Sequence, residues 1–172
     1  REILLDWFDE LCGARLTTSW YRIGGVERDL TPSLIDKLKQ FLDYFPPKID
    51  EYQVFLEKNR IWLGRTKGVA VISAEDAVSF GLSGPVLRGS GVDYDLRKYE
   101  PYSAYPKCEF SVNKKKNGDT YDRYWIRVME LYESVKIIRQ CLEQMQDGPV
   151  MADVPSVTLP PKERVFTNLE SM

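Results

Sequence analysis

The feature that most constrains the fold is a long apolar pattern in the second half of the chain. Apolar residues follow Asp119, a good N-cap, at spacings of three and four: Tyr121, Tyr124, Val128, Leu131, Val135, Ile138, Leu142 and Met145. This spacing predicts one α-helix over residues 120–146, about 40 Å long at 1.5 Å per residue. Trp125, Met129 and Tyr132 widen its apolar face beyond a two-stranded seam. The helix therefore needs neighbours on more than one side, as in a helical bundle.

The other periodic segments are shorter. Apolar spacing and capping residues predict helices at about residues 3–12, 32–45, 47–58 and 74–80. We expect Pro46 and Pro47 to break or sharply kink the chain between the second and third of these, because proline lacks an N–H donor and clashes with the preceding turn. Cys108, Phe110 and Val112 alternate with polar residues, which predicts one short strand. Prolines make residues 149–161 an extended connector. The predicted class is mainly α, with long loops and at most a short strand.

Both ends of the sequence read as positions inside a longer protein. Arg1-Glu2-Ile3 already belongs to an amphipathic pattern, with no initiator methionine before it. Thr167 and Glu170 have the spacing of a capping box that opens a helix, yet the sequence stops at residue 172. We therefore expect these 172 residues to be the central fragment of one larger domain.

Composition excludes several classes of function. Apolar residues make up 43% of the chain and charged residues 29%, as in ordinary soluble globular proteins. The net charge of −2 leaves no basic excess, so nucleic acid is not expected as a partner. Histidine is absent, which removes Ser-His-Asp and Cys-His catalysis and His-ligated zinc from within this chain. No apolar stretch reaches the roughly 18 residues that a membrane-spanning helix needs.

The three cysteines, Cys12, Cys108 and Cys141, are far apart in the sequence and form no CxxC pair. An odd number of cysteines without a regular framework indicates reduced thiols, as in the cytosol, rather than a secreted disulfide scaffold. We expect them to be small packing residues and expect this chain to hold no metal.

The richest group of candidate site residues lies in the loop at residues 84–98. Asp93 and Asp95 would share one side of an extended backbone, where Arg88 and Arg97 can pair with them. One interpretation is an ion-pair network that supports a nearby site or takes part in proton transfer. The alternative is structural, with arginines that neutralise buried carboxylates.

A second group consists of Arg22 and the glycine pair Gly24 and Gly25. Adjacent glycines between an arginine and an apolar residue indicate a tight turn or a close approach of two segments. A turn needed only for packing is the alternative.

A third group, Asp119, Asp122 and Arg123, opens the long helix. Carboxylates suit this position because the N-terminus of a helix carries a partial positive charge. Helix capping together with a surface ion pair is the alternative to a functional role.

These groups belong to a longer series of motifs. In order, the motifs are Ala14-Arg15-Leu16, Tyr21-Arg22-Ile23-Gly24-Gly25-Val26, Asn59-Arg60-Ile61, Arg65-Thr66-Lys67-Gly68-Val69, Ile72-Ser73-Ala74-Glu75-Asp76-Ala77, the segment from Gly84-Pro85 to Arg97, Glu100-Pro101-Tyr102, Gly118-Asp119-Thr120-Tyr121-Asp122-Arg123-Tyr124 and Pro160-Pro161-Lys162. Together they resemble the hydrogenase-like large subunit of NADH–quinone oxidoreductase, which is respiratory complex I. The resemblance extends over essentially the whole chain.

The resemblance implies a helical fold similar to the large subunit of nickel–iron hydrogenases, without their metal. It implies a place in the module where quinone, bound at the parent subunit, is reduced. Electrons would come from NADH at a distant subunit, through iron–sulfur clusters that end on a neighbouring small subunit, and the reaction would drive proton translocation by the membrane arm. The expected partners are therefore other complex I subunits, especially that small subunit, and the expected location is peripheral, on the cytoplasmic face of a bacterial inner membrane or the equivalent matrix side.

The quinone-ligating His and Tyr of the family have no match in this chain, so we expect no catalytic residue here and no activity of the isolated fragment. The matched motifs imply support of the quinone site or proton coupling by Arg22, Gly24, Gly25, Arg88, Asp93, Asp95, Arg97, Asp119, Asp122 and Arg123. One alternative is the large subunit of a membrane-bound nickel–iron hydrogenase, which would need CxxC pairs near both ends of the parent chain. The other is a helical scaffold without enzymatic function.

Overall fold

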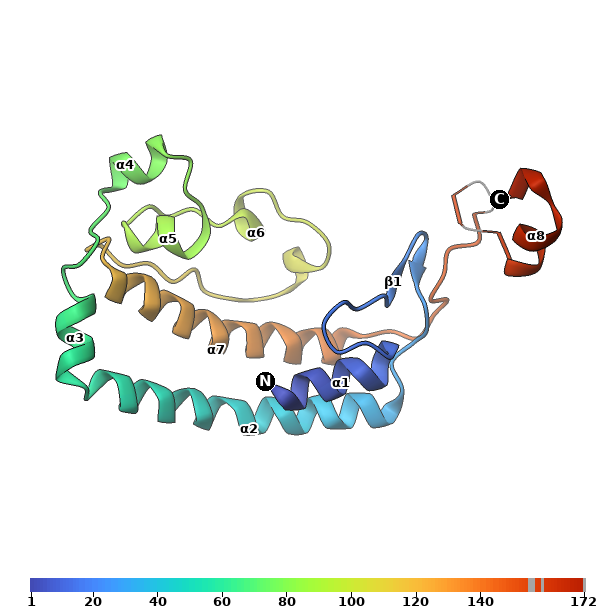
Figure 1. The fold of residues 1–172 in the computed structure, drawn as a ribbon, viewed down its shortest axis with the longest axis horizontal. Coiled ribbons are helices and arrows are strands. Elements are labelled where there is room, and N and C mark those ends of the chain that lie inside the picture. Colours follow the sequence, from blue (N-terminus) through green and yellow to red (C-terminus); the bar gives the residue numbers. More distant parts are fainter. Residues whose placement is uncertain (155–156, 159, 172) are drawn as a thin grey trace. The chain divides into compact units, whose positions relative to one another are not determined.

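The chain forms two compact units, which the computed structural model describes over residues 1–154, 157–158 and 160–171 (Figure 1). The first unit contains Arg1–Phe41 and Gln146–Met172, and the second contains Leu42–Met145. Helices predominate, so the predicted mainly α class is confirmed. Within the described ranges no helix is both long and apolar enough to cross a membrane.

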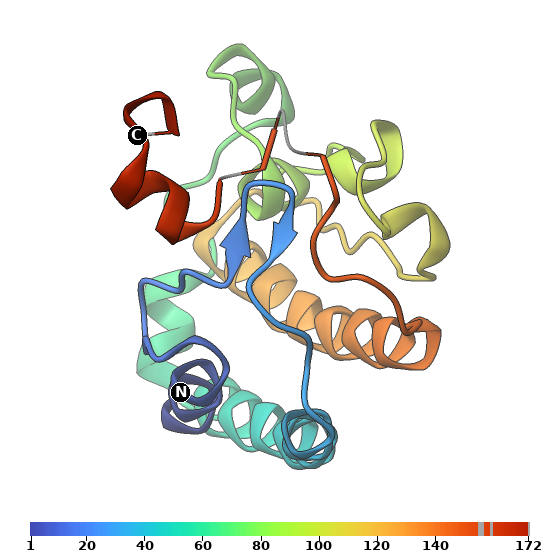
Figure 2. The same cartoon turned by 90° about the vertical axis from the view of Figure 1, so that its right-hand side faces the viewer.

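The second unit is built around a long helix. Its elements are α3 (Arg60–Thr66), α4 (Ala74–Ser79), α5 (Gly84–Gly89), α6 (Leu96–Tyr99), the 3₁₀ turn η1 (Tyr105–Lys107) and α7 (Thr120–Gln144). It also contains the C-terminal part of α2 (Pro32–Glu57), which runs beside α7 in both views (Figures 1 and 2). Its apolar core consists of Leu42, Ile49, Ala77, Leu87, Phe110, Ile126, Val128 and Val135.

Helix α7 coincides with the predicted long helix, and it buries some but not all of the predicted apolar side chains. Asp119 caps its N-terminus, as expected, and its carboxylate accepts the Asp122 N–H at 2.8 Å. Ile126 is fully buried, whereas Leu131, which belongs to the predicted apolar seam, is 41% exposed. The predicted apolar pattern is therefore confirmed at Val128 and Val135 and wrong at Leu131. The buried stripe includes Asp122 and Glu133 because these carboxylates bind backbone groups of neighbouring segments.

Helix α2 runs without interruption through Pro46 and Pro47, so the predicted division into two helices is wrong. The two prolines cannot donate to the carbonyls of Leu42 and Asp43, four residues earlier. Arg139 of α7 compensates: its guanidinium donates to the Leu42 carbonyl at 3.1 Å and to the Asp43 carboxylate at 2.7 Å. A partner from another helix thus satisfies a carbonyl that the proline leaves free, and the helix continues.

The strand predicted around Cys108 and Val112 is also wrong, because residues 108–113 pair with no other strand in the described parts of the chain. The backbone of this segment instead binds side chains of α7. Ser111 N–H donates to the Glu133 carboxylate at 2.9 Å. Alternating residues are therefore held against a helix surface, an arrangement that sequence alternation alone does not distinguish from strand pairing.

In the first unit, α1 (Glu2–Cys12) packs on the N-terminal part of α2. Trp7 Nε1 donates to the Leu34 carbonyl at 2.9 Å, and Lys37 pairs with Glu10 at 2.5 Å. Leu11 and Leu34 are both buried there. A two-stranded antiparallel hairpin, β1 (Tyr21–Arg22) and β2 (Gly25–Val26), follows α1.

The C-terminal segment of this unit contains α8 (Lys162–Thr167) and the 3₁₀ turn η2 (Leu169–Ser171). The capping box predicted at Thr167 and Glu170 is wrong. Thr167 ends α8 and its hydroxyl donates to the Glu163 carbonyl at 2.7 Å, while the Asn168 side chain accepts the Glu170 N–H at 3.0 Å. Of the predicted connector at 149–161, residues 155, 156 and 159 lie outside the described residues.

The role of Arg139 can be tested with Arg139→Met, which keeps the apolar stem but removes the donors. Loss of a charge-assisted hydrogen bond to a buried carbonyl should lower the free energy of unfolding by about 1–2 kcal/mol, measured by chemical denaturation. Arg127→Met is the matched control, since Arg127 is an exposed α7 arginine whose one hydrogen bond among the described residues stays within its own helix, to Arg123 O at 3.0 Å. Equal effects of the two substitutions would contradict this account of the proline-containing helix.

Candidate functional site

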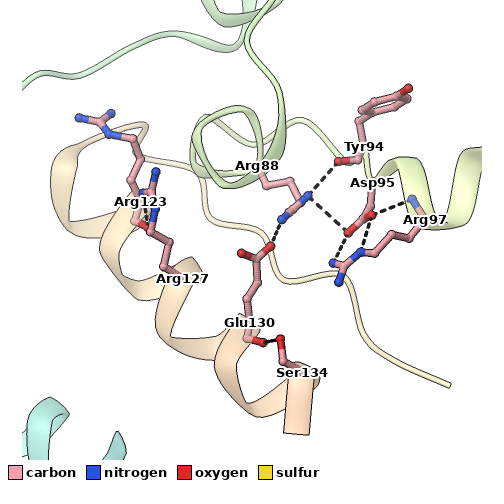
Figure 3. Close-up of polar contacts among 8 residues, drawn as sticks. All are labelled: Arg88, Tyr94, Asp95, Arg97, Arg123, Arg127, Glu130 and Ser134. Atoms are coloured by element: carbon pink, nitrogen blue, oxygen red, sulfur yellow. Dashed lines mark hydrogen bonds and ion pairs between the residues drawn. The ribbon is translucent and has the colours of Figure 1, made fainter. Parts of the chain in front are cut away.

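A network of four charged side chains, two of them buried, joins three helices of the second unit (Figure 3). Arg88 of α5 contacts Asp95, the N-cap of α6, with 3.4 Å between Nη1 and Oδ2, and its other terminal nitrogen contacts Glu130 of α7. Arg97 of α6 completes the group. Arg88 and Asp95 are each only 4% exposed. Two positive and two negative groups balance, which lowers the cost of removing them from water.

Asp95 and Arg97 are joined by three hydrogen bonds, more than any other pair of this network. The Arg97 guanidinium donates from Nε to Oδ1 at 3.0 Å and from Nη2 to Oδ2 at 2.6 Å, and the Arg97 backbone N–H also donates to Oδ1 at 3.0 Å. The hydrogen bond from Arg97 holds the pKa of the Asp95 carboxyl below its usual value, against the opposing effect of burial. The same bond raises the pKa of Arg97.

Arg88 connects this pair to α7. Its Nη1 also donates to the Tyr94 carbonyl at 3.4 Å, and its Nε is buried without a hydrogen-bond partner among the described residues. Burial lowers the pKa of the Arg88 guanidinium and Asp95 opposes that shift, but an arginine remains protonated at physiological pH. The arginines and Asp95 therefore act as fixed charges that hold α5 and α6 to α7.

Asp93, which the sequence placed beside Asp95, lies outside the network. Its carboxylate pairs with Lys114 at 2.5 Å, and both side chains are about half exposed. Glu130, in contrast, was not predicted. The signal that could have found it is a carboxylate between Met129 and Leu131, inside the apolar pattern of α7, where an acidic group needs a cationic partner.

The group at the start of α7 binds backbone rather than other charges. Asp119 accepts the Gly68 N–H at 2.8 Å, and Asp122, which is 1% exposed, accepts the Asn117 N–H at 2.8 Å. Arg123 donates to the carbonyls of Gly118 at 2.6 Å and Ala70 at 3.1 Å. These contacts favour the structural interpretation of this group, because each side chain satisfies a polar backbone group of a loop.

The two groups of the second unit meet at Gly89 and Gly118. A Cβ at Gly89 would lie 3.2 Å from Cγ of Arg123, and the Gly118 N–H donates to the Gly89 carbonyl at 2.9 Å. Gly118 has a φ of +66°, and a Cβ there would lie 2.1 Å from the Ile72 carbonyl oxygen. Only glycine allows this close approach.

The remaining predicted residues lie in the hairpin of the first unit. Arg22 pairs with Glu27 at 3.0 Å. Gly24 O accepts the Ala152 N–H at 2.8 Å, and a Cβ at Gly25 would lie 2.1 Å from the Val150 carbonyl oxygen. The glycine pair thus provides both a turn and a close approach. A cleft of about 710 Å³ beside the hairpin is lined in part by Arg22, Glu27, Asp153 and Arg164.

Over the described ranges, no three His, Cys, Asp or Glu side chains come together as a metal site would require.

Asp95 and Asp93 provide a matched pair of substitutions. Asp95→Asn should lower the free energy of unfolding by about 3 kcal/mol, because it removes the carboxylate that pairs with Arg97 and leaves the buried Arg88 with Glu130 alone. Asp93→Asn should lower it by less than about 1 kcal/mol, as expected for an exposed ion pair. Chemical denaturation of both variants and of the unsubstituted protein measures the difference. Similar losses of stability in the two variants would contradict the assigned network.

The lowered pKa of Asp95 also predicts a pH dependence. Its stabilising effect is present in full above the pKa of an unfolded Asp, about 3.9, and is lost as the pH falls through the lower pKa of the folded state. The free energy of unfolding should therefore fall more steeply with acidification in the parent protein than in Asp95→Asn. Denaturation curves from neutral pH down to about pH 3 test this expectation, and parallel curves for the two proteins would refute it.

Comparison with known proteins places this geometry in a family. The family described as respiratory-chain NADH dehydrogenase, 49 Kd subunit, matches residues 1–172. An NADH-quinone oxidoreductase subunit of Geotalea uraniireducens is 48% identical over 172 residues, which are 100% of this chain and 44% of that protein. The corresponding subunit of Magnetococcus marinus is 48% identical over 100% of this chain and 43% of that protein, and one from Rhizobium meliloti is 45% identical over the same shares. The chain thus spans less than half the length of these relatives. It belongs to the family of the 49 kDa subunit of respiratory-chain NADH dehydrogenase.

Proposed function

We propose that this chain is part of the quinone-reducing module of a proton-pumping NADH:quinone oxidoreductase. The observation that carries the proposal is the family match over all 172 residues, together with relatives named as NADH-quinone oxidoreductase subunits. In this proposal electrons from NADH, bound at a distant subunit, reach quinone at the parent subunit through iron–sulfur clusters. The partners are other subunits of the complex, especially the small subunit that carries the terminal cluster, and the membrane arm indirectly.

The location that follows is peripheral. The parent subunit would sit on the cytoplasmic face of a bacterial inner membrane, or on the equivalent matrix side, and would reach the membrane arm through other subunits. The cofactors would belong to the assembly: quinone at the parent subunit and an iron–sulfur cluster on its neighbour, with none held by these residues themselves.

Within that module, the role of these residues is structural support. Arg88, Asp95, Arg97 and Glu130 hold the segment at 84–99 to α7 through charges. Proton transfer through this network would require a group that gains and loses a proton near neutral pH. Arginine does not do so, and the lowered pKa of Asp95 keeps that carboxylate ionised. Arg88, Arg97 and Asp95 therefore favour fixed support of the site over a proton route through these three groups.

Deleting the parent gene from its host should abolish proton-pumping NADH:quinone reductase activity in the membranes, and restoring the gene should return it. Complementation with Asp95→Asn should reduce the amount of assembled complex because the network is broken, while the protons pumped per electron remain unchanged in the complex that does assemble. Asp93→Asn is the control and should match the parent gene in both respects. Assembly is measured by native gel electrophoresis, and pumping by acidification of inverted membrane vesicles.

Two results would count against these assignments. If the complex with Asp95→Asn assembled normally but pumped fewer protons per electron, the network would have a role in proton coupling rather than in structural support. Membranes that keep full proton-pumping NADH:quinone reductase activity without the gene of the complete subunit would contradict the proposed function itself. A parent reading frame with CxxC pairs near both ends would instead indicate a nickel–iron hydrogenase.

A further inference from the structure

Side chains of the C-terminal half of α7 bind the backbone of residues 107–111 in the second unit. We call this set of hydrogen bonds the clasp. Gln144 Nε2 donates to the Lys107 carbonyl at 3.2 Å. Gln140 makes two bonds to Glu109: its Nε2 donates to the carbonyl at 2.8 Å, and its Oε1 accepts the N–H at 2.7 Å. The segment is therefore held in a fixed register against the helix, on both sides of residue 108.

Two cysteines face each other inside this clasp. The sulfur atoms of Cys108 and Cys141 are 3.9 Å apart, although the residues are 33 positions apart in the sequence. A disulfide needs its sulfur atoms about 2.05 Å apart, so closure requires the two sulfur atoms to approach by roughly 2 Å. Cys141 is exposed and Cys108 is partly buried, so an oxidant in solution reaches Cys141 more easily.

We propose that Cys108 and Cys141 form an oxidation-sensitive dithiol that hydrogen peroxide converts reversibly into a disulfide. The Cys141 thiolate attacks a peroxide oxygen, the O–O bond breaks, and a sulfenic acid and one water form. Cys108 then attacks the Cys141 sulfur, the S–S bond forms, the S–O bond breaks, and a second water leaves. The two thiols give up two electrons and two protons, which the peroxide takes up. A dithiol reductant reverses the change.

The surroundings of Cys141 set how readily this reaction begins. Although Cys141 as a whole is exposed, partial desolvation of its thiol and the hydrogen bond with the Cys108 thiol raise its pKa, so the reactive thiolate is a minor species at neutral pH. The reaction should therefore be slow with trace peroxide and should accelerate as the pH rises. Such a pair responds to sustained oxidative conditions.

The cross-link would also bear on the buried ion-pair network. Phe110, between Glu109 and Ser111 in the clasped segment, is 9% exposed, and the Arg97 guanidinium carbon lies 4.7 Å from the centre of its ring. Fixing residue 108 to α7 limits how far Phe110 can move away from Arg97. Oxidation would thus tighten the contact between this segment and the residues that hold α6.

The test uses the complete parent protein in the membranes of the cell that makes it. Membranes are treated with hydrogen peroxide, free thiols are blocked by alkylation, and peptides are mapped by mass spectrometry without reduction. The expected product is a peptide pair joined through Cys108 and Cys141, which dithiothreitol separates. Cys12 is the internal control: its thiol donates to the Phe8 carbonyl at 3.3 Å within α1, and it should remain alkylatable. Cys108 and Cys141 that stay as alkylatable as Cys12, or cross-links to other chains instead, would overturn the proposal.

Two variants test the order of events and the contribution of the clasp. In Cys108→Ser the resolving thiol is missing, so Cys141 should accumulate as a sulfenic acid that a 1,3-dicarbonyl probe labels. In Gln140→Ala the register is loosened, and the disulfide should form severalfold more slowly. Ser134→Ala is the matched control on the same helix, because the Ser134 hydroxyl donates to Glu130 O at 2.8 Å within α7. Equal rates in Gln140→Ala and Ser134→Ala, or no sulfenic acid in Cys108→Ser, would contradict the proposed mechanism.

Discussion

The second unit is held together by side chains of α7 that form hydrogen bonds with backbone groups of neighbouring loops and of α2. Buried N–H and C=O groups must find partners, and a chain with long loops has many that no helix or sheet satisfies. Side chains of α7 meet this need at several levels of the helix: Arg123 binds two loop carbonyls, Glu133 and Gln140 bind the segment at 107–111, and Arg139 binds α2. A helix that only packed its apolar face would leave these groups unsatisfied, and the loops could not lie against it.

The charged network adds a different kind of constraint. Each buried ion costs several kcal/mol to desolvate, so such a group persists only with balanced charge and directed hydrogen bonds. Arg97 meets Asp95 in the two-point geometry that a guanidinium and a carboxylate allow, and Lys could not reproduce it. Arg88 of α5 contacts both Asp95 at the start of α6 and Glu130 of α7, so it links α6 to α7. The network fixes geometry, which suits the proposed support of a site formed with other subunits.

What the sequence predicted correctly is local. Asp119 was identified as the cap of α7 because a cap bonds within three residues of itself, and that bond is present. The continuous α2 was missed because its compensating arginine lies 97 positions away from Leu42. The strand predicted at 108–112 was wrong for the same reason, since the segment is held by α7 side chains such as Glu133, which lies 22 positions from Ser111. Among the candidate site residues, the arginines were grouped correctly with Asp95, but nothing local distinguishes exposed Asp93 from buried Asp95.

Three titratable groups of the second unit have pKa values shifted away from the neutral range. Hydrogen bonding to Arg97 lowers the pKa of Asp95, and hydrogen bonds from Lys136 and the Ser111 N–H outweigh the desolvation of Glu133 and lower its pKa as well. Burial, reinforced by the hydrogen bond to Asp50, raises the pKa of Tyr132 to about 12. These carboxylates and this phenol therefore keep their charge state across the neutral range. The thiols of Cys108 and Cys141, in contrast, can change chemically under oxidising conditions, and they lie where a covalent bond would reinforce the contacts that α7 already makes.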